Sequence, residues 1–342
     1  MSRVARAPDP NPAAGLSLVR ARPLALGPLE ATFSLRPGDR PLVAVGEAVD
    51  RGVALADRLR DPRTEVVSVP AGSEGVEPGA FWARPPGRRR TAGVEHGELL
   101  FRSGGRWRIG AGEHHEPLEA PFPGVVARVR PGIEIRVRTD GRGIPGHEVL
   151  AGPASGRLEV MASRDGEVRA SEIDVGGAGA ILVTGAHIDA EAITRARAVG
   201  VRGIVVATLG VKERRDVLAS ERRGQAAAHG LPTFAILVLD GAVRRPIASP
   251  VMALFQRLAG RTVAIVGDPP ALIFDDPGFD LSPPEPDLVR VVAGPLAGAE
   301  GRWAGLAGPC RFPAGVVLEA GLVAFGGGPP VAVPLGDLER FV

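Results

Sequence analysis

Three side chains in this sequence have the types and positions for acid–base or group-transfer chemistry. His187, Lys212 and Asp240 each follow a short apolar run that reads as a buried strand, and the runs are 180–183, 203–207 and 233–238. Parallel strands place the residues that follow them at one edge of a sheet, where α/β proteins bind ligands. The three side chains would form an enzyme site if they converge; otherwise they are solvent-exposed loop residues, which is the simpler interpretation.

Other motifs for catalysis or metal binding are missing from the sequence. It has no G-x-S-x-G, no phosphate-binding loop ending in lysine and no G-x-G-x-x-G that opens a helix. His114-His115-Glu116 could ligate a metal, but adjacent side chains in an extended segment point to opposite faces, so a surface loop is favoured. We therefore expect no metal and no cofactor, and the sequence favours a protein without catalytic activity.

Composition excludes several kinds of site. Lys212 is the only lysine and Cys310 is the only cysteine, so the chain alone cannot form a disulfide, an iron–sulfur cluster or a cysteine-rich zinc site. The net charge of +2 gives no general reason for binding nucleic acid or membranes. Since no apolar run approaches about 20 residues, we expect a cytoplasmic protein without a membrane span.

The elements that would position the three candidates lie between residues 176 and 267. Apolar runs alternate with helical patterns, and Asp189 and Ser249-Pro250 begin two predicted helices, 190–199 and 249–259. Alternation at this spacing predicts an α/β domain with a mainly parallel four-stranded sheet. Its strands are expected at 180–183, 203–207, 233–238 and 262–266.

The remaining chain divides by composition into four segments, and the predicted fold class is multidomain α+β. Residues 1–32 are rich in Pro, Ala and Arg and read as a flexible arm, whereas 33–175 have the short, glycine-punctuated runs of a β-rich domain. Residues 268–286 contain six prolines and read as a linker. The final segment, 287–342, reads as a small β-barrel.

The C-terminal segment contains a strand, a glycine-rich turn and a second strand. Leu288–Val292 precedes the turn Ala293-Gly-Pro-Leu-Ala-Gly-Ala-Glu-Gly301, and Trp303 follows it. This pattern resembles the KOW motif of NusG-type transcription factors and several ribosomal proteins, which implies an SH3-like barrel. The resemblance implies that a partner contacts Gly294, Pro295, Leu296, Gly298, Gly301, Arg302 and Trp303.

The charge of this segment bears on the kind of partner. Residues 287–342 hold four arginines against five acids, so they supply little of the counterion release that drives nucleic-acid binding. We expect a protein partner, with RNA as the alternative.

The β-rich segment resembles a barrel-sandwich hybrid, the fold of biotinyl and lipoyl carriers and of the N-terminal domain of RnfC-like subunits. Pro37-Gly38, Gly46-x-x-Val49-x-x-Gly52 and Ala120-Pro-Phe-Pro-Gly-Val-Val126 carry this resemblance. No lysine precedes Lys212, so covalent biotin or lipoate is excluded, and one cysteine cannot build the clusters of RnfC-like chains.

Together these features predict a non-catalytic adaptor whose KOW-like module contacts the ribosome or the transcription machinery. One alternative is an enzyme or ligand-binding protein with a site at His187, Lys212 and Asp240. A second alternative is an accessory subunit of a redox complex.

Overall fold

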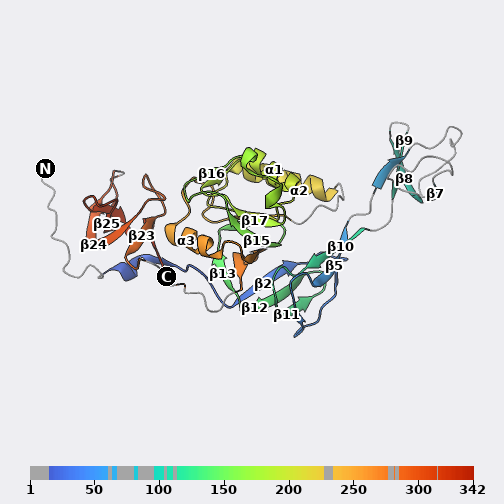
Figure 1. Cartoon of the computed structure of the whole chain (residues 1–342), viewed down its shortest axis with the longest axis horizontal. Helices are drawn as coiled ribbons and strands as arrows, with labels where there is room; N and C mark the ends of the chain where they lie inside the picture. The colour runs from blue at the N-terminus through green and yellow to red at the C-terminus, as the bar shows by residue number, and fades with distance from the viewer. Residues whose placement is uncertain are drawn as a thin grey trace.

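The protein is mostly β-structure arranged in several sheets, with three α-helices in the described part of the chain. The computed structural model describes residues 15–60, 64–67, 81–83, 96–103, 106–110, 114–226, 234–275, 281, 285–313 and 315–342. Figure 1 shows an α/β body between a C-terminal β-unit on one side and smaller sheets on the other.

An eight-stranded mixed sheet, which we call the central sheet, forms the middle of the molecule. Its order is β13 (Arg142–Pro145), β22 (Pro270–Phe274), β21 (Thr262–Gly267), β15 (Ala154–Val160), β17 (Ala180–Val183), β19 (Gly203–Val206), β20 (Ala235–Val238) and β14 (Glu148–Ala151). Strands β15, β17, β19 and β20 are parallel, and the other neighbours pair antiparallel.

Helices cover both faces of the central sheet. Helices α1 (Ala190–Val199) and α2 (Val211–Ala226) share a core with one face, whereas α3 (Ser249–Leu258) packs on the other. In β17, Ile181 and Val183 point to the α3 side and Leu182 points to the α1 side, which explains the continuous apolar run. No helix within the described ranges is both long and apolar enough to cross a membrane.

The predicted strands and helices of the α/β region occur at the expected places in the sequence, but the direction of one strand and the extent of the sheet differ from the prediction. Three of the four expected strands are parallel, but the fourth, β21, pairs antiparallel with β15. The sheet also begins at Arg142 rather than near 176. The first strands were missed because β13 and β15 contain glycine and arginine among few apolar residues, so they lack the apolar run of a buried strand.

Two small sheets share a second core beside the central sheet. One has the order β10 (His114–Glu119), β5 (Ala54–Arg60), β3 (Arg40–Pro41), and the other β2 (Leu29–Ser34), β12 (Glu134–Thr139), β11 (Gly124–Arg130), β4 (Ala48–Val49). Phe33, Phe122 and Ile135 lie in this core together with Val266 and Ile273 of the central sheet. The β-rich region therefore packs directly on β21 and β22.

A four-stranded sheet is inserted between β5 and β10. Its order is β6 (Thr64–Val67), β9 (Arg106–Gly110), β8 (His96–Ser103), β7 (Phe81–Ala83). Leu99, Trp107 and Ile109 are buried in it. Two further short strands, β16 (Glu167–Val168) and β18 (His187–Ile188), pair with each other.

The C-terminal sheet has six strands and includes one from the N-terminal part of the chain. Its order is β1 (Arg20–Arg22), β27 (Leu338–Phe341), β23 (Leu288–Val291), β24 (Glu300–Arg311), β25 (Val317–Ala324), β26 (Val331–Pro334). Its core contains Trp303, Val323 and Leu338. Short 3-10 turns occupy Leu16–Leu18, Ala170–Glu172, Val175–Gly177 and Leu335–Asp337.

Two boundary predictions are wrong. Residues 15–32 are not a loosely ordered arm, because β1 pairs with β27 and β2 with β12. The predicted linker begins with a buried strand, β22, whose apolar residues Ala271–Phe274 outweigh the prolines around them. Residues 1–14 and most of 276–284 lie outside the described residues.

Gly321 offers a test of packing in the C-terminal sheet. A Cβ at this position would lie 2.1 Å from Cζ3 of Trp303, whose ring crosses the glycine. We expect Gly321→Ala to lower the free energy of unfolding by about 1–3 kcal/mol through overpacking, measured by urea denaturation. Gly336→Ala is the control because its Cβ would meet nothing within 4 Å, and equal losses in the two variants would contradict this packing.

Candidate functional site

The loops that follow β17, β19 and β20 meet at one edge of the central sheet, as parallel strands require. The backbone N–H of Asp240 donates to the carbonyl of Ala207 at 2.8 Å. Thr208 donates to the carbonyl of Ala186 from its backbone N–H at 3.2 Å and from its Oγ1 at 2.7 Å. These bonds fix the three loops to one another at the carboxyl edge.

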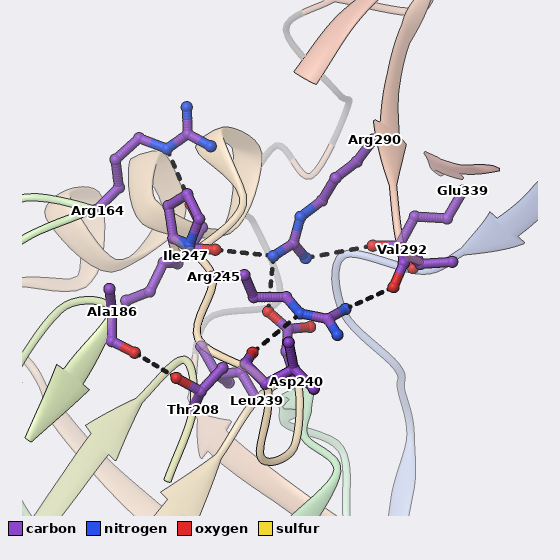
Figure 2. A network of polar contacts seen from close by, with 12 residues as sticks. Arg164, Ala186, Thr208, Leu239, Asp240, Arg245, Ile247, Arg290, Val292 and Glu339 are labelled. Carbon is purple, nitrogen blue, oxygen red and sulfur yellow. Dashed lines mark hydrogen bonds and ion pairs between the residues drawn. The ribbon is translucent and has the colours of Figure 1, made fainter. Parts of the chain in front are cut away.

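The Asp240 carboxylate at this edge is occupied by two arginines. Oδ1 accepts from Arg22 Nη1 at 2.7 Å, and Oδ2 accepts from Arg290 Nη2 at 2.9 Å. The Asp240 side chain is 5% exposed and that of Arg290 is 0% exposed. Figure 2 shows the Arg290 guanidinium extending from the C-terminal sheet toward Asp240.

Glu339 completes a buried ion network, a name we use for Arg22, Asp240, Arg290 and Glu339. Its Oε1 lies 3.3 Å from Arg290 Nη1 and 3.4 Å from Arg22 Nη1. Two backbone carbonyls also accept from the arginines: Pro246 from Arg290 at 2.7 Å and Leu239 from Arg22 at 3.3 Å. The network joins β1, β23 and β27 to the loop after β20.

Strand alternation explains why a charged side chain of β23 faces the central sheet. Val289 and Val291 point into the core of the C-terminal sheet, so Arg290 between them points to the opposite face. Arg290 and Glu339 are also direct cross-strand partners on β23 and β27, which places their charges side by side.

Burial and charge oppose each other within the network. Burial would raise the pKa of Asp240, but the charges and hydrogen bonds of Arg290 and Arg22 outweigh it and hold this pKa below its ordinary value. Burial would likewise lower the pKa of Arg22, but Asp240 and Glu339 raise it. A carboxylate held ionised by two guanidinium groups is a poor proton acceptor and a good anchor.

A second polar contact joins the C-terminal sheet to helix α3. Glu300 of β24 accepts from the backbone N–H of Ser249 at 2.8 Å and from the Ser249 hydroxyl, and it pairs with Arg164 at 2.8 Å. A carboxylate at this position satisfies an orphan donor of the helix and interacts favourably with its dipole. A residue of the C-terminal sheet thus caps helix α3, which packs on the central sheet.

The glycine-rich turn lies against the same edge. Arg245 donates to the carbonyl of Val292 at 3.0 Å, as Figure 2 shows. Gly298 has φ +89°, and a Cβ there would lie 2.9 Å from Arg245 Cβ and Pro246 Cδ. The turn needs glycine at 298 for its conformation and for its close approach to the neighbouring loop.

The other two predicted catalytic residues have different surroundings from Asp240. His187 is half-buried in β18, and Lys212 is exposed in the first turn of α2. Within the described ranges, no hydrogen bond or ion pair links His187, Lys212 and Asp240 side chains to one another. The loops that carry these three residues thus lie at one edge of the central sheet. The Asp240 carboxylate, however, pairs with Arg22 and Arg290 rather than with His187 or Lys212.

The predicted partner-binding residues fall into two groups. Gly298, Gly301 and Trp303 are buried against this chain's own atoms. Gly294, Pro295 and Leu296 are exposed, and exposed Arg302 pairs with Glu285 at 3.0 Å and Asp287 at 3.3 Å. Only the second group is accessible to another molecule.

The His114–Glu116 segment is strand rather than the predicted surface loop. It lies in β10, where His115 Nδ1 is 2.8 Å from Asp57 Oδ2 of the neighbouring strand β5. The described residues contain no cluster of three or more His, Cys, Asp or Glu side chains suited to a metal.

Four residues that build this site were not singled out from the sequence: Arg22, Arg290, Glu300 and Glu339. Arg290 carried one usable signal, since it is a charge in the middle of the apolar run Leu288-Val-Arg-Val291. The others carried none, because their partners come from remote parts of the chain.

No family model matches this chain, and no curated protein matches it either. Its function must therefore be argued from the geometry of its own residues.

Removing Asp240 tests the network. In Asp240→Ala, the buried Arg290 guanidinium loses an acidic partner, and we expect the free energy of unfolding to fall by about 3–5 kcal/mol. Asp287→Ala, which breaks an exposed pair with Arg302, is the control and should cost about 1 kcal/mol or less. Urea denaturation measures both, and comparable small losses would count against the network as an anchor.

The pH dependence of stability gives a second test. Because the pKa of folded Asp240 lies below the ordinary value of 3.8, the ionised carboxylate stabilises the fold above that value. The contribution is lost as the pH falls through the lower pKa of the folded state. The difference in unfolding free energy between the wild type and Asp240→Asn should therefore be largest near neutral pH and narrow below 3.8. A difference independent of pH would contradict this assignment.

Proposed function

We propose that the protein is a non-catalytic adaptor whose C-terminal sheet binds a macromolecular partner, a protein of the ribosome or of the transcription machinery. One observation carries the proposal. At the sheet edge where an α/β enzyme would hold its substrate, the Asp240 carboxylate is engaged by the chain's own C-terminal sheet, with Arg290 inserted against it. The buried ion network anchors the C-terminal sheet to the central sheet. The Asp240 carboxylate is therefore engaged in ion pairs and does not act as a base.

The order of elements supports the KOW-like interpretation of the C-terminal sheet. Strand β23, a turn with left-handed Gly294 and Gly298, and strand β24 follow one another as that resemblance implies. The unit differs from a self-contained module of residues 287–342 because β1 pairs with β27. We therefore treat residues 16–22 as part of the binding module.

The outer part of the module offers a surface for a protein. Strand β23 pairs with β24 only at residues 300–302, and β26 pairs with β25 only at 320–323, so the ends of β24 and β25 project as a two-stranded ribbon. Val316, Val317 and Leu318 on this ribbon are 49%, 59% and 43% exposed. We call these three residues the ribbon tip.

A two-stranded ribbon cannot bury such side chains by itself. Large apolar side chains exposed together at the end of a ribbon are candidates for protein contact on either of its faces. The charges agree with a protein partner, because Arg290, Glu300 and Glu339 are engaged within the chain. The other charges of the module are Arg20, Arg302, Arg311 and Arg340 against Asp287, Glu319 and Asp337, and an excess of one positive charge gives little attraction for nucleic acid.

The double substitution Val317→Asp/Leu318→Asp tests this function in the full-length chain. We expect the wild type to bind either purified ribosomes or purified RNA polymerase from the source organism in cosedimentation or interferometry. The charges should weaken that binding at least about tenfold, since desolvating a carboxylate in an apolar contact costs well over 1.4 kcal/mol.

Val175→Asp/Val211→Asp is the matched control, because both valines are exposed, by 77% and 75%, but lie on the central unit. This control should bind as the wild type does, and all three proteins should unfold at similar urea concentrations. The proposal fails if neither ribosomes nor polymerase bind, or if the two double variants bind equally.

A further inference from the structure

The outer face of the sheet formed by β2, β12, β11 and β4 carries a concentration of arginines. Along β12, Ile135 and Val137 point into the core shared with β5 and β10. Side chains alternate along a strand, so Arg136 and Arg138 point to solvent. This sheet lies away from the C-terminal sheet, on the other side of the central body (Figure 1).

The neighbouring strand adds two more arginines to the same face. After a bulge at 126–128, Arg128 and Arg130 of β11 flank Val129, which packs against the core. The side chains of Arg128, Arg130 and Arg136 are 53%, 45% and 34% exposed, and Arg138 is exposed as well. We call Arg128, Arg130, Arg136 and Arg138 the arginine face.

The acids on this face do not balance the arginines. Glu134 is the shared partner of three of them, with Oε1 at 4.0 Å from Arg128, 2.9 Å from Arg130 and 3.2 Å from Arg136. Glu30 lies 3.4 Å from Arg136. Four arginines against two glutamates leave an excess of two positive charges.

The strand register makes this excess costly for the fold. Arg128 and Arg136 are direct cross-strand partners, and like charges placed opposite each other destabilise a sheet. Glu134 bridges Arg128 and Arg136 and offsets part of this repulsion, but it lies 4.0 Å from Arg128, so the face keeps a positive charge that an anion could neutralise.

We propose that the arginine face binds the phosphate backbone of a single-stranded nucleic acid. Guanidinium groups bind phosphate bidentately, and outward side chains repeat about every 6.6 Å along each strand, which makes a track of donors. Thr32 and Ser34 of β2 are the cross-strand partners of Arg136 and Glu134, and their hydroxyl groups can donate to phosphate oxygens. The contacts are to phosphate, so binding is independent of base sequence.

This inference concerns a different sheet and a different class of ligand from the protein contact proposed for the ribbon tip. Its test uses the full-length protein and fluorescein-labelled single strands of about 20 nucleotides, longer than the site of one small module. With two phosphates neutralised by the excess of two charges, the salt slope for a single strand is about −1.4, so affinity should fall about sevenfold between 50 and 200 mM salt. Fluorescence anisotropy measures these affinities.

Arg128→Gln/Arg138→Gln removes two arginines, one of which contacts Glu134 only at 4.0 Å. We expect weaker binding at low salt and little remaining fall in affinity over the same salt range, because both excess charges are removed. Arg157→Gln/Arg215→Gln is the matched control, because these arginines are 60% and 77% exposed on the central unit. It should bind as the wild type does, and equal urea midpoints should show that both variants fold.

Several outcomes would overturn the proposal. The proposal fails if the wild type shows no saturable binding at low salt, or if the two double variants bind with equal affinity. It also fails if the protein binds anionic lipid vesicles but not RNA. A preference of more than about tenfold between RNA and DNA strands of the same sequence would also overturn it, because contacts to phosphate alone give no such discrimination.

Discussion

The buried pairing of Arg290 with Asp240 holds the C-terminal sheet against the central sheet. A guanidinium group that is fully buried needs acceptors in fixed positions, since an unpaired buried charge is strongly unfavourable. Asp240, Glu339 and the carbonyl of Pro246 supply them from two separate sheets. The C-terminal sheet can satisfy Arg290 only when it is docked against the loop after β20. One buried cation therefore fixes the relation between the two units.

The two ends of the described chain strengthen the same junction. Val342 donates to the carbonyl of Arg22 at 3.0 Å and accepts from the N–H of Leu24 at 2.9 Å. Leu24 and Phe341 lie in the core of the central sheet, although Phe341 belongs to a strand of the C-terminal sheet. The junction thus combines apolar burial with the ion network. The C-terminal sheet is better described as part of a continuous body than as a module on a flexible tether.

This arrangement separates the inward surfaces of the protein from its outward ones. Gly298, Trp303 and Glu300 serve internal contacts, although the sequence motif around them suggests recognition. The outward surfaces are the apolar ribbon tip on one side and the arginine face on the other. Their chemistry differs: one would lose water from apolar side chains on binding, and the other would release counterions.

Elements whose signal is local could be predicted from the amino-acid sequence. The strands β17, β19 and β20 were predicted because both of their faces are buried, and α1 was predicted from its Asp189 cap and its Gly200 stop. The turn between β23 and β24 was predicted because its glycines need positive φ. Each of these features depends on neighbours within a few residues, so it can be read from the chain alone.

Three features depend on contacts between remote parts of the chain: the antiparallel pairing of β21, the place of β1 in the C-terminal sheet and the partners of Asp240. Arg22 and Asp240 are 218 residues apart, and Arg290 and Asp240 are 50 apart. A carboxylate after a strand looks the same in sequence whether it faces a substrate or a buried arginine. Its role is set by which charges the fold brings to it, because Coulomb interactions and burial depend on distance in space rather than along the chain.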